Sequence, residues 1–171
     1  MNSKFRKSVI CGVFIALFVV LSYVELDLRV MKLTFSSLPV VVAGLVFGPL
    51  AGFTVGFLGS FIQQILKFGL MPTTILWMLP VALRGLVVGL FSKRYDYRMN
   101  YPQTVICMIV SSLLVSAANT PVIYLDSKLY GYYSFEYVFA GSVARFITGA
   151  AVAVILSVIA YPVSKALRRQ I

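Results

Sequence analysis

The chain has 171 residues, of which 60% are hydrophobic and 12% are charged, and its net charge is +10. A typical soluble domain has roughly 45–50% apolar and about 25% charged residues, so this composition excludes an ordinary soluble domain. The basic excess would favour nucleic-acid binding in a soluble protein, whereas in a membrane protein it is typical of cytoplasmic loops.

Six largely apolar segments approach the length of about 20 residues that a membrane-spanning helix needs. Residues 8–24 follow a basic start like that of a signal peptide, but no small-residue cleavage site follows, so we expect a retained helix. Residues 37–47 form a short segment that ends at Gly48-Pro49, because proline cannot continue a helix. The remaining segments are residues 50–68, 73–91, 103–124 and 137–163. The sequence therefore predicts an all-α integral membrane protein, with one transmembrane domain over residues 1–171 that forms a six-helix bundle.

The basic residues are distributed unevenly between the two ends of this bundle. With the N-terminus in the cytoplasm, nine basic residues fall inside and four outside, whereas four of the five acidic residues fall outside. Cytoplasmic connections carry an excess of Lys and Arg, so the pattern predicts an N-in/C-in, multi-pass protein of the cell membrane. The nine inside residues are Lys4, Arg6, Lys7, Lys93, Arg94, Arg98, Lys165, Arg168 and Arg169. This topology explains the basic excess, so we expect no nucleic-acid partner.

The residues that catalysis and metal binding require are nearly absent. The chain has no histidine, and both cysteines, Cys11 and Cys107, lie in apolar segments. A His/Cys metal site and a serine–histidine nucleophile are therefore excluded, and no disulfide framework is indicated. No acidic residue lies within an apolar stretch, and no GxxxxGK[ST] loop is present. We expect neither an enzyme nor a bound metal or cofactor, and active transport would need energy from a partner or an ion gradient.

Small residues four positions apart mark faces where membrane helices approach closely. Contacts within the bundle account for most of these stripes. Gly12 and Ala16 in the first segment are consistent either with such contacts or with contact to a partner protein. The other stripes are Gly44, Gly48, Gly52, Gly56 and Ser60; Gly85 and Gly89; and Gly141, Gly149, Ala153 and Ser157.

Arg145 lies two turns into the last segment, on the small-residue stripe between Gly141 and Gly149, and so faces the bundle. An ionisable side chain within a membrane segment marks a functional site by default. A planar, permanently charged guanidinium suits an anionic ligand, ideally a carboxylate held by two parallel hydrogen bonds. The alternative is a structural arginine that caps helix carbonyls or pairs with Glu136.

Arg84 and Trp77 lie seven residues apart on a similar face of the fourth segment. Arg84 is placed to snorkel to the cytoplasmic surface, where a structural or partner-contact role is expected, and ligand binding is the alternative. Trp77 either belongs to an interfacial aromatic belt or stacks on a flat ligand.

Further polar residues converge toward the outer half of the predicted bundle. Ser112, Ser116 and Asn119 share one face of the fifth segment, and the amide of Asn119 is suited either to a heterocyclic ligand or to a helix backbone. Other candidates either contribute to a site or form solvated ends and loops, and these are Gln64, Lys67, Arg29 and Phe35. This asymmetry predicts an outward-facing binding cup rather than a pore.

Three stretches of the sequence carry a family resemblance. They are KLTFSSLPVVVAGLVFGPLAGFTVGFLGS (residues 32–60), ALRGLVVGLF (82–91) and NTPVIYLDSKLYG (119–131), followed by Arg145. With six helices and this length, the chain resembles the substrate-binding S components of energy-coupling factor vitamin transporters, nearest to the folate members. Residues 69–80 depart from the Phe-Pro-Gly-Phe-Thr type of entry to helix four that many folate members have.

The resemblance implies a subunit that binds a vitamin, with folate as the nearest match, from outside through helices four to six and the outer loops. It would dock on a transmembrane coupling subunit and two ATPase subunits and topple in the lipid bilayer to release the vitamin inside. The family's coupling motif on the first helix is matched loosely by Gly12 and Ala16. Arg145 would bind a carboxylate, Asn119 the pterin edge, and Trp77 would stack on a ring.

Three other classes of protein compete with this interpretation. An integral-membrane enzyme conflicts with the missing histidine and membrane acids. A scaffold without a ligand leaves Arg145 and the outer polar residues unexplained. A stand-alone secondary carrier, or an S component for a different vitamin, is the alternative that remains.

Overall fold

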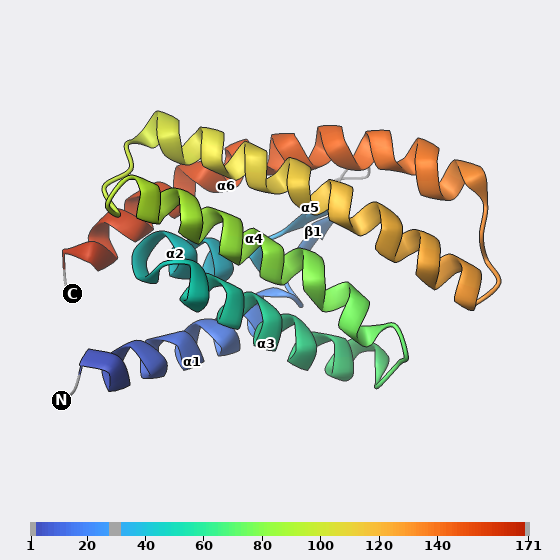
Figure 1. The fold of residues 1–171 in the computed structure, drawn as a ribbon, viewed down its shortest axis with the longest axis horizontal. Helices are drawn as coiled ribbons and strands as arrows, with labels where there is room; N and C mark the ends of the chain where they lie inside the picture. The colour runs from blue at the N-terminus through green and yellow to red at the C-terminus, as the bar shows by residue number, and fades with distance from the viewer. Residues whose placement is uncertain (1–2, 28–31, 170–171) are drawn as a thin grey trace.

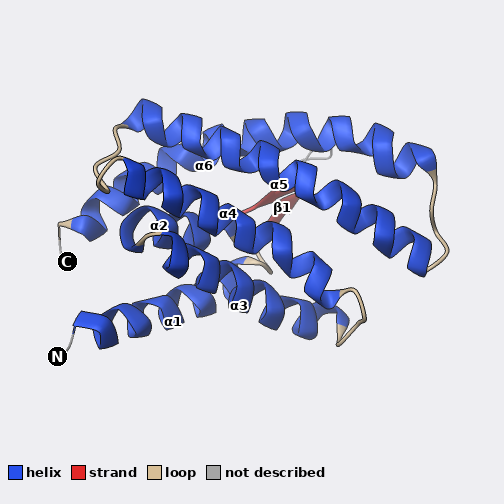
Figure 2. Ribbon diagram, in the orientation of Figure 1, coloured by secondary structure: helices blue, strands red, loops and turns tan. Residues whose placement is uncertain are grey.

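The computed structural model describes residues 3–27 and 32–169, and it is built almost entirely of helices (Figures 1 and 2). The described part contains six α-helices, a short π-helix and one small β-hairpin between α1 and α2. The all-α, six-helix prediction is thus confirmed. The hairpin pairs β1 antiparallel with β2. The elements are α1 (Ser3–Leu21), β1 (Glu25–Asp27), β2 (Lys32–Thr34), α2 (Ser37–Phe47), α3 (Pro49–Phe68), α4 (Thr74–Arg94), α5 (Tyr101–Leu129), η1 (Glu136–Ala140) and α6 (Gly141–Arg168).

The described helix ends and connections fall into two groups at opposite ends of the bundle. Helix α1 begins, α4 connects to α5, and α6 ends on the same side of the molecule, whereas the α3–α4 and α5–η1 connections lie on the other (Figure 1). The nine basic residues predicted to lie inside belong to the first of these sides, which we call the basic end. The opposite side is the far end.

Four helical segments are long and apolar enough to cross a membrane, and they are Pro49–Phe68, Thr74–Arg94, Tyr101–Leu129 and Glu136–Arg168. Helix α2 has only 11 residues. It spans about 16 Å, roughly half of the hydrocarbon core, so it does not cross as a separate transmembrane helix. Helix α1 has 19 residues and is not among these four segments, because three of its first five residues are basic and its apolar part is shorter.

The last two long helices exceed the predicted ranges. Helix α5 continues through Pro121 to Leu129, five residues past the expected end, so this proline does not terminate it. Residues 136–140, part of which was predicted as the start of the last helix, form the π-helix η1, and α6 continues to Arg168. Turns beyond an apolar stretch carry little hydrophobic signal, which is why sequence pattern underestimates them.

Glycine-to-backbone contacts hold α2, α3 and α4 together. A Cβ atom added at Gly52 would overlap the backbone of Gly85, and one added at Gly85 would overlap that of Gly52. A Cβ at Gly56 would lie 2.8 Å from the carbonyl oxygen of Val81, and one at Gly44 would lie 2.9 Å from that of Gly85. The predicted close-approach faces on these three helices are therefore confirmed.

The small-residue pair on α1 does not pack against another helix of the bundle. Gly12 and Ala16 are both exposed, and a Cβ added at Gly12 would meet nothing within 4 Å. Helix α1 instead packs through Phe18, which is buried against Gly59 of α3. Of the two explanations for Gly12 and Ala16, contact within the bundle is therefore wrong for this chain.

Candidate functional site

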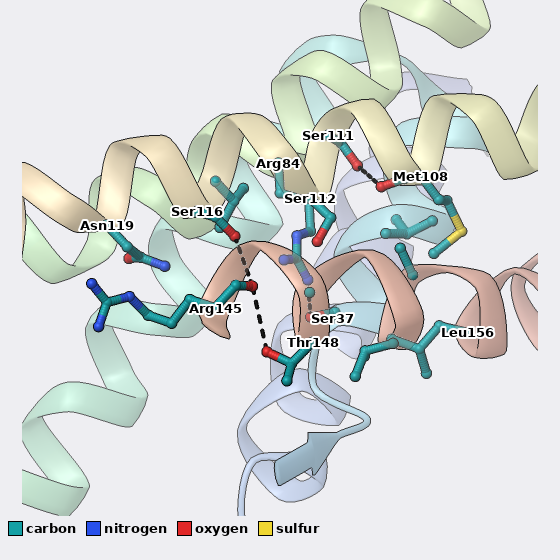
Figure 3. Close-up of a pocket in the computed structure, with 15 residues that line it drawn as sticks. Ser37, Arg84, Met108, Ser111, Ser112, Ser116, Asn119, Arg145, Thr148 and Leu156 are labelled. Atoms are coloured by element: carbon teal, nitrogen blue, oxygen red, sulfur yellow. Dashed lines mark hydrogen bonds between the residues drawn. The ribbon is translucent and has the colours of Figure 1, made fainter. Parts of the chain in front are cut away.

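A cavity of about 210 Å³ lies among α2, α4, α5 and α6 and holds both membrane arginines (Figure 3). Eight of its lining residues are polar, and none is aromatic. We call it the arginine cavity. Its polar lining consists of Ser37, Arg84, Ser111, Ser112, Ser116, Asn119, Arg145 and Thr148, and its remaining lining consists of Val41, Met108, Val115, Gly149, Val152, Ala153 and Leu156.

Arg84 points into the bundle, so the prediction that it snorkels to the cytoplasmic surface is wrong. Its Nη1 donates a hydrogen bond to the hydroxyl of Ser37, the first residue of α2. The short helix α2 begins here, and its N-cap residue Ser36 makes no side-chain cap hydrogen bond. A helix N-terminus carries partial positive charge, so Arg84 and the start of α2 together create a strongly positive wall of the cavity.

Arg145 lines the same cavity from α6, and its side chain extends away from Arg84 toward Asn119 (Figure 3). Its Nη2 donates to the carbonyl oxygen of Val138 in η1 at 2.8 Å, while its Nε is buried without a hydrogen-bond partner. Capping of a helix carbonyl, one of the two structural roles considered from sequence, is thus present. The described structure contains no Arg145–Glu136 ion pair. The unpartnered Nε leaves hydrogen-bonding capacity that an acceptor can satisfy.

Helix α5 contributes a polar face to the cavity, as its spacing predicted. Ser112, Ser116 and Asn119 all line it, and Figure 3 shows the Asn119 amide on the side toward which the Arg145 side chain extends. The Ser116 hydroxyl donates to the Arg145 carbonyl oxygen at 3.4 Å. Gly149 packs against this face, since a Cβ there would lie 2.9 Å from Ser112 Oγ.

Trp77 and Gln64 lie in a second cavity, of about 390 Å³, which we call the aromatic cavity. It is formed by α3, α4, the end of α5 and the residues after it. Trp77 Nε1 donates to Asp126 Oδ1 at 3.2 Å, and the Tyr132 hydroxyl donates to Asp126 Oδ2. The aromatic cavity is lined by Gln64, Phe68, Met71, Thr73, Thr74, Trp77, Asp126, Tyr130 and Tyr132.

The Trp77–Asp126–Tyr132 network was not foreseen from sequence. Burial and the hydrogen bond to the Asp126 carboxylate together raise the pKa of Tyr132 to about 12, because both disfavour the phenolate. The spacing offered one signal: Trp77 lies seven residues before Arg84, and Asp126 lies seven residues after Asn119. Seven helical residues rise about 10 Å, so the aromatic cavity lies two turns along the same two helices from the arginine cavity.

The other predicted residues lie outside both cavities or outside the described chain. Lys67 Nζ donates to the carbonyl oxygen of Ser22 at 2.6 Å and lies 5.1 Å from the ring centre of Tyr23, so it joins α3 to the end of α1. Phe35 packs against the core formed by α2, α4, α5 and α6. Arg29 lies outside the described residues. Sequence reasoning missed Ser37, Ser111 and Thr148, whose only signal was a hydroxyl in an apolar segment.

The family model described as "ECF-type riboflavin transporter, S component" matches residues 2–169. The chain is 32% identical over 101 residues to a UPF0397 protein of Streptococcus thermophilus, covering 57% of this chain and 54% of the relative. It is 29% identical over 93 residues to a UPF0397 protein of Lactobacillus johnsonii, covering 48% and 49%. The chain thus spans about half the length of the curated relatives it matches.

A solved structure also matches the fold. It is described as "Structure and mechanism of the S component of a bacterial ECF transporter", and it aligns with a TM-score of 0.67. The alignment covers 97% of this chain and 99% of the other at 16% identity, so this likeness shows a shared fold.

Proposed function

We propose, since the chain belongs to the family of ECF-type riboflavin transporter S components, that its arginine cavity binds the carboxylate of a vitamin. S components are multi-pass, non-enzymatic membrane proteins that bind a small vitamin substrate and work with a transmembrane T component and ATPases. The observation that carries the proposal is the presence of two arginines in one polar cavity within the membrane helices, without an acidic residue in its lining.

The argument is electrostatic. A charged guanidinium within a bilayer is costly unless a partner compensates it, and two in one cavity also repel each other. Among the described residues, the two guanidinium groups donate hydrogen bonds only to neutral acceptors, the Ser37 hydroxyl and the Val138 carbonyl. An anionic ligand offsets both costs and is further stabilised by the N-terminus of α2.

Folate fits this chemistry better than riboflavin does. Riboflavin, the vitamin in the family description, is neutral at pH 7 and supplies no anion for Arg84 and Arg145. Folate carries a flat pterin ring at one end and two carboxylates at the other. We place the carboxylates at the arginines, with Asn119 as a further hydrogen-bonding partner.

Placement of the ring differs from the assignment suggested by the family resemblance. The arginine cavity has no aromatic lining residue, whereas Trp77, Tyr130 and Tyr132 line the aromatic cavity two turns away. An elongated ligand that lies along α4 and α5, with its carboxylates in the arginine cavity, therefore has its ring near Trp77 and away from Asn119. Asn119 then contacts the middle or the tail of the ligand, and the pterin edge lies in the aromatic cavity.

Delivery of the ligand requires a coupling surface and an orientation. Gly12 and Ala16 form an exposed small-residue patch on α1, which suits close approach by a helix of the coupling subunit. Nine basic residues at one end of the bundle support an N-in/C-in orientation. In that orientation the aromatic cavity lies toward the outside, and folate enters there before the complex with its ATPases releases it inside.

The test is folate and riboflavin binding by the purified chain, followed by calorimetry, together with mass spectrometry of any vitamin that co-purifies. We expect tight folate binding and an affinity loss of roughly tenfold to a hundredfold in Arg145→Ala, because a charge-assisted hydrogen bond contributes about 1.5–3 kcal/mol. Arg94→Ala, which removes a cation outside the cavity, is the matched control. Unchanged folate affinity in Arg145→Ala, or preferential riboflavin binding, contradicts the proposal.

A further inference from the structure

A third cavity, of about 490 Å³, lies at the basic end, remote from the arginine and aromatic cavities. We call it the basic cavity. One wall is the connection between α4 and α5, and the other is the last two turns of α6. It is lined by Asp96, Tyr97, Arg98, Met99, Asn100, Tyr161, Ser164, Lys165, Arg168 and Arg169.

The charges around the basic cavity are unbalanced. Four cations, Arg98, Lys165, Arg168 and Arg169, face one acid, Asp96. Among the described residues none of the four cations forms an ion pair, and Arg168 Nε is buried without a hydrogen-bond partner. Like charges that line one cavity repel each other, so a bound anion stabilises the arrangement.

One of these cations, Arg168, is held in the cavity by a hydrogen bond to the end of α2. Pro49 has no N–H to donate to the carbonyl oxygen of Leu45, four residues earlier in the chain. Ser92 Oγ and Arg168 Nη2 donate to that oxygen instead, at 2.6 Å and 2.9 Å. The end of α6 is thereby held against the end of α2, and Arg168 serves as a structural cap with its Nε unused.

The α4–α5 connection, which forms the opposite wall of the cavity, is held in place by backbone hydrogen bonds. Asp96 and Tyr97 adopt left-handed backbone conformations, with φ of 49° and 59°, which turn the chain sharply after α4. The Tyr97 N–H donates to the Ser92 carbonyl oxygen at 2.8 Å and the Arg98 N–H to that of Tyr95 at 2.9 Å. The connection therefore fixes the backbone at Arg98, which lines the same cavity as Lys165.

The surface beside the basic cavity favours a lipid over a soluble anion. On α6, Val154, Val158 and Tyr161 precede Lys165 at helical spacing, and Val158 is 57% exposed. Tyr161 contacts the ring of Tyr101 edge-on, and tyrosines are enriched at membrane–water interfaces. An apolar stripe that leads directly into a cluster of cations matches the acyl chain and the headgroup of one molecule.

From these observations we propose that the basic cavity binds the phosphate headgroup of an anionic phospholipid, with Arg98 and Lys165 as its principal ligands and an acyl chain along Val154 and Val158. Basic pockets between membrane helices on the cytoplasmic side are suited to such headgroups. The lipid bridges the α4–α5 connection and α6, and so links the two walls independently of the vitamin site.

Native mass spectrometry of the purified full chain, with phosphatidylglycerol or phosphatidylcholine added in mixed micelles, tests the proposal. We expect retained phosphatidylglycerol adducts, and a loss of lipid affinity of at least about tenfold in the double variant Arg98→Gln/Lys165→Gln. The matched control is Lys93→Gln/Arg94→Gln, which removes two cations from the same end but outside the cavity. The charge-preserving Arg98→Lys/Lys165→Arg should retain lipid binding, which separates loss of charge from misfolding.

Three results overturn the proposal. The first is equal loss of phosphatidylglycerol in the two double Gln variants, which would indicate general surface charge. The second is equal retention of phosphatidylcholine and phosphatidylglycerol by the wild-type chain. The third is complete displacement of the lipid by millimolar inorganic phosphate, which would indicate a site for a soluble anion. Retained folate binding in all variants would show that the vitamin site is intact.

Discussion

Small residues serve opposite purposes on two sides of the bundle. On the side formed by α2, α3 and α4, the backbones of Gly52 in α3 and Gly85 in α4 touch so closely that neither position has room for a methyl group. On the side formed by α5 and α6, Gly149 of α6 meets only the hydroxyls of Ser112 and Ser116 of α5 and lies on the wall of a cavity. The first side is a rigid scaffold, and the second is a site in which side chains can rearrange around a ligand. Substitutions on the two sides should therefore fail in different ways.

The largest effect is expected from Gly85→Ala. Its added methyl group would overlap the backbone of Gly52, and backbone cannot move aside as a side chain can. We expect destabilisation of about 3 kcal/mol or a failure to fold, measured as thermal unfolding in detergent. Gly12→Ala, whose methyl group meets nothing within 4 Å, is the control and should leave the unfolding temperature unchanged or slightly higher, because alanine favours a helix more than glycine does. Equal stability of the two variants would refute the rigid-scaffold description.

A second prediction concerns the exposed face of α1, which contributes to neither side of this comparison. Gly12→Leu/Ala16→Leu should abolish most vitamin uptake in cells that contain the coupling subunits, because bulky residues prevent close helix approach. Folate binding by the purified variant should be unchanged, since both residues are exposed and far from the site. If uptake persists, the coupling surface lies elsewhere on the chain.

Gly149→Ala tests the adaptable side with the same chemical change as Gly85→Ala. Its methyl group would lie 2.9 Å from Ser112 Oγ and 3.2 Å from Ser116 Oγ, and these hydroxyls can rotate. We expect a stability loss below about 1 kcal/mol but a several-fold weaker affinity for folate, because the cavity becomes smaller. A stability loss as large as that of Gly85→Ala would show that both sides are equally rigid.

The smallest effect should come from the aromatic cavity at high pH. Tyr132 has a pKa raised to about 12, against an ordinary value near 10, so its protonated form stabilises the fold. That contribution is complete below pH of about 10 and is lost as the pH rises toward 12. We expect the unfolding temperature of the wild-type chain to fall more steeply over this interval than that of Tyr132→Phe. Parallel pH profiles would remove Tyr132 from the network.

Much of the fold was predictable because helix formation depends on local sequence. The apolar segments indicated six helices, and the 37–47 segment coincides with α2 because Pro49 has no N–H to continue the ladder. The spacing of Ser112, Ser116 and Asn119 placed them on one face, and all three line the arginine cavity. The ends of α5 and α6 were missed, since extra turns outside the apolar core carry no distinguishing pattern.

Long-range partners were not predictable from spacing. Ser37 and Arg84 are separated by 47 residues, as are Leu45 and Ser92, and Trp77 and Asp126 by 49. Arg84 was expected near the cytoplasmic surface because its helix position permits snorkelling, yet it turns inward toward α2. The position of Arg84 along α4 was correct, but the direction of its side chain depended on a helix that periodicity cannot place.

The sequence by itself therefore determined the membrane class, the helices and the segregation of basic residues to one end, because hydrophobicity and charge act on each segment separately. Only the tertiary structure decided that Arg84 joins Arg145 in one cavity, that Trp77 lies in another, and that Arg168 closes the carbonyl left open by Pro49. These pairings depend on how glycine contacts bring α2, α3 and α4 together, and that packing involves residues far apart in the chain. Most of the positive charge of the described chain thus lies in three places: the surface of the basic end, the arginine cavity and the basic cavity.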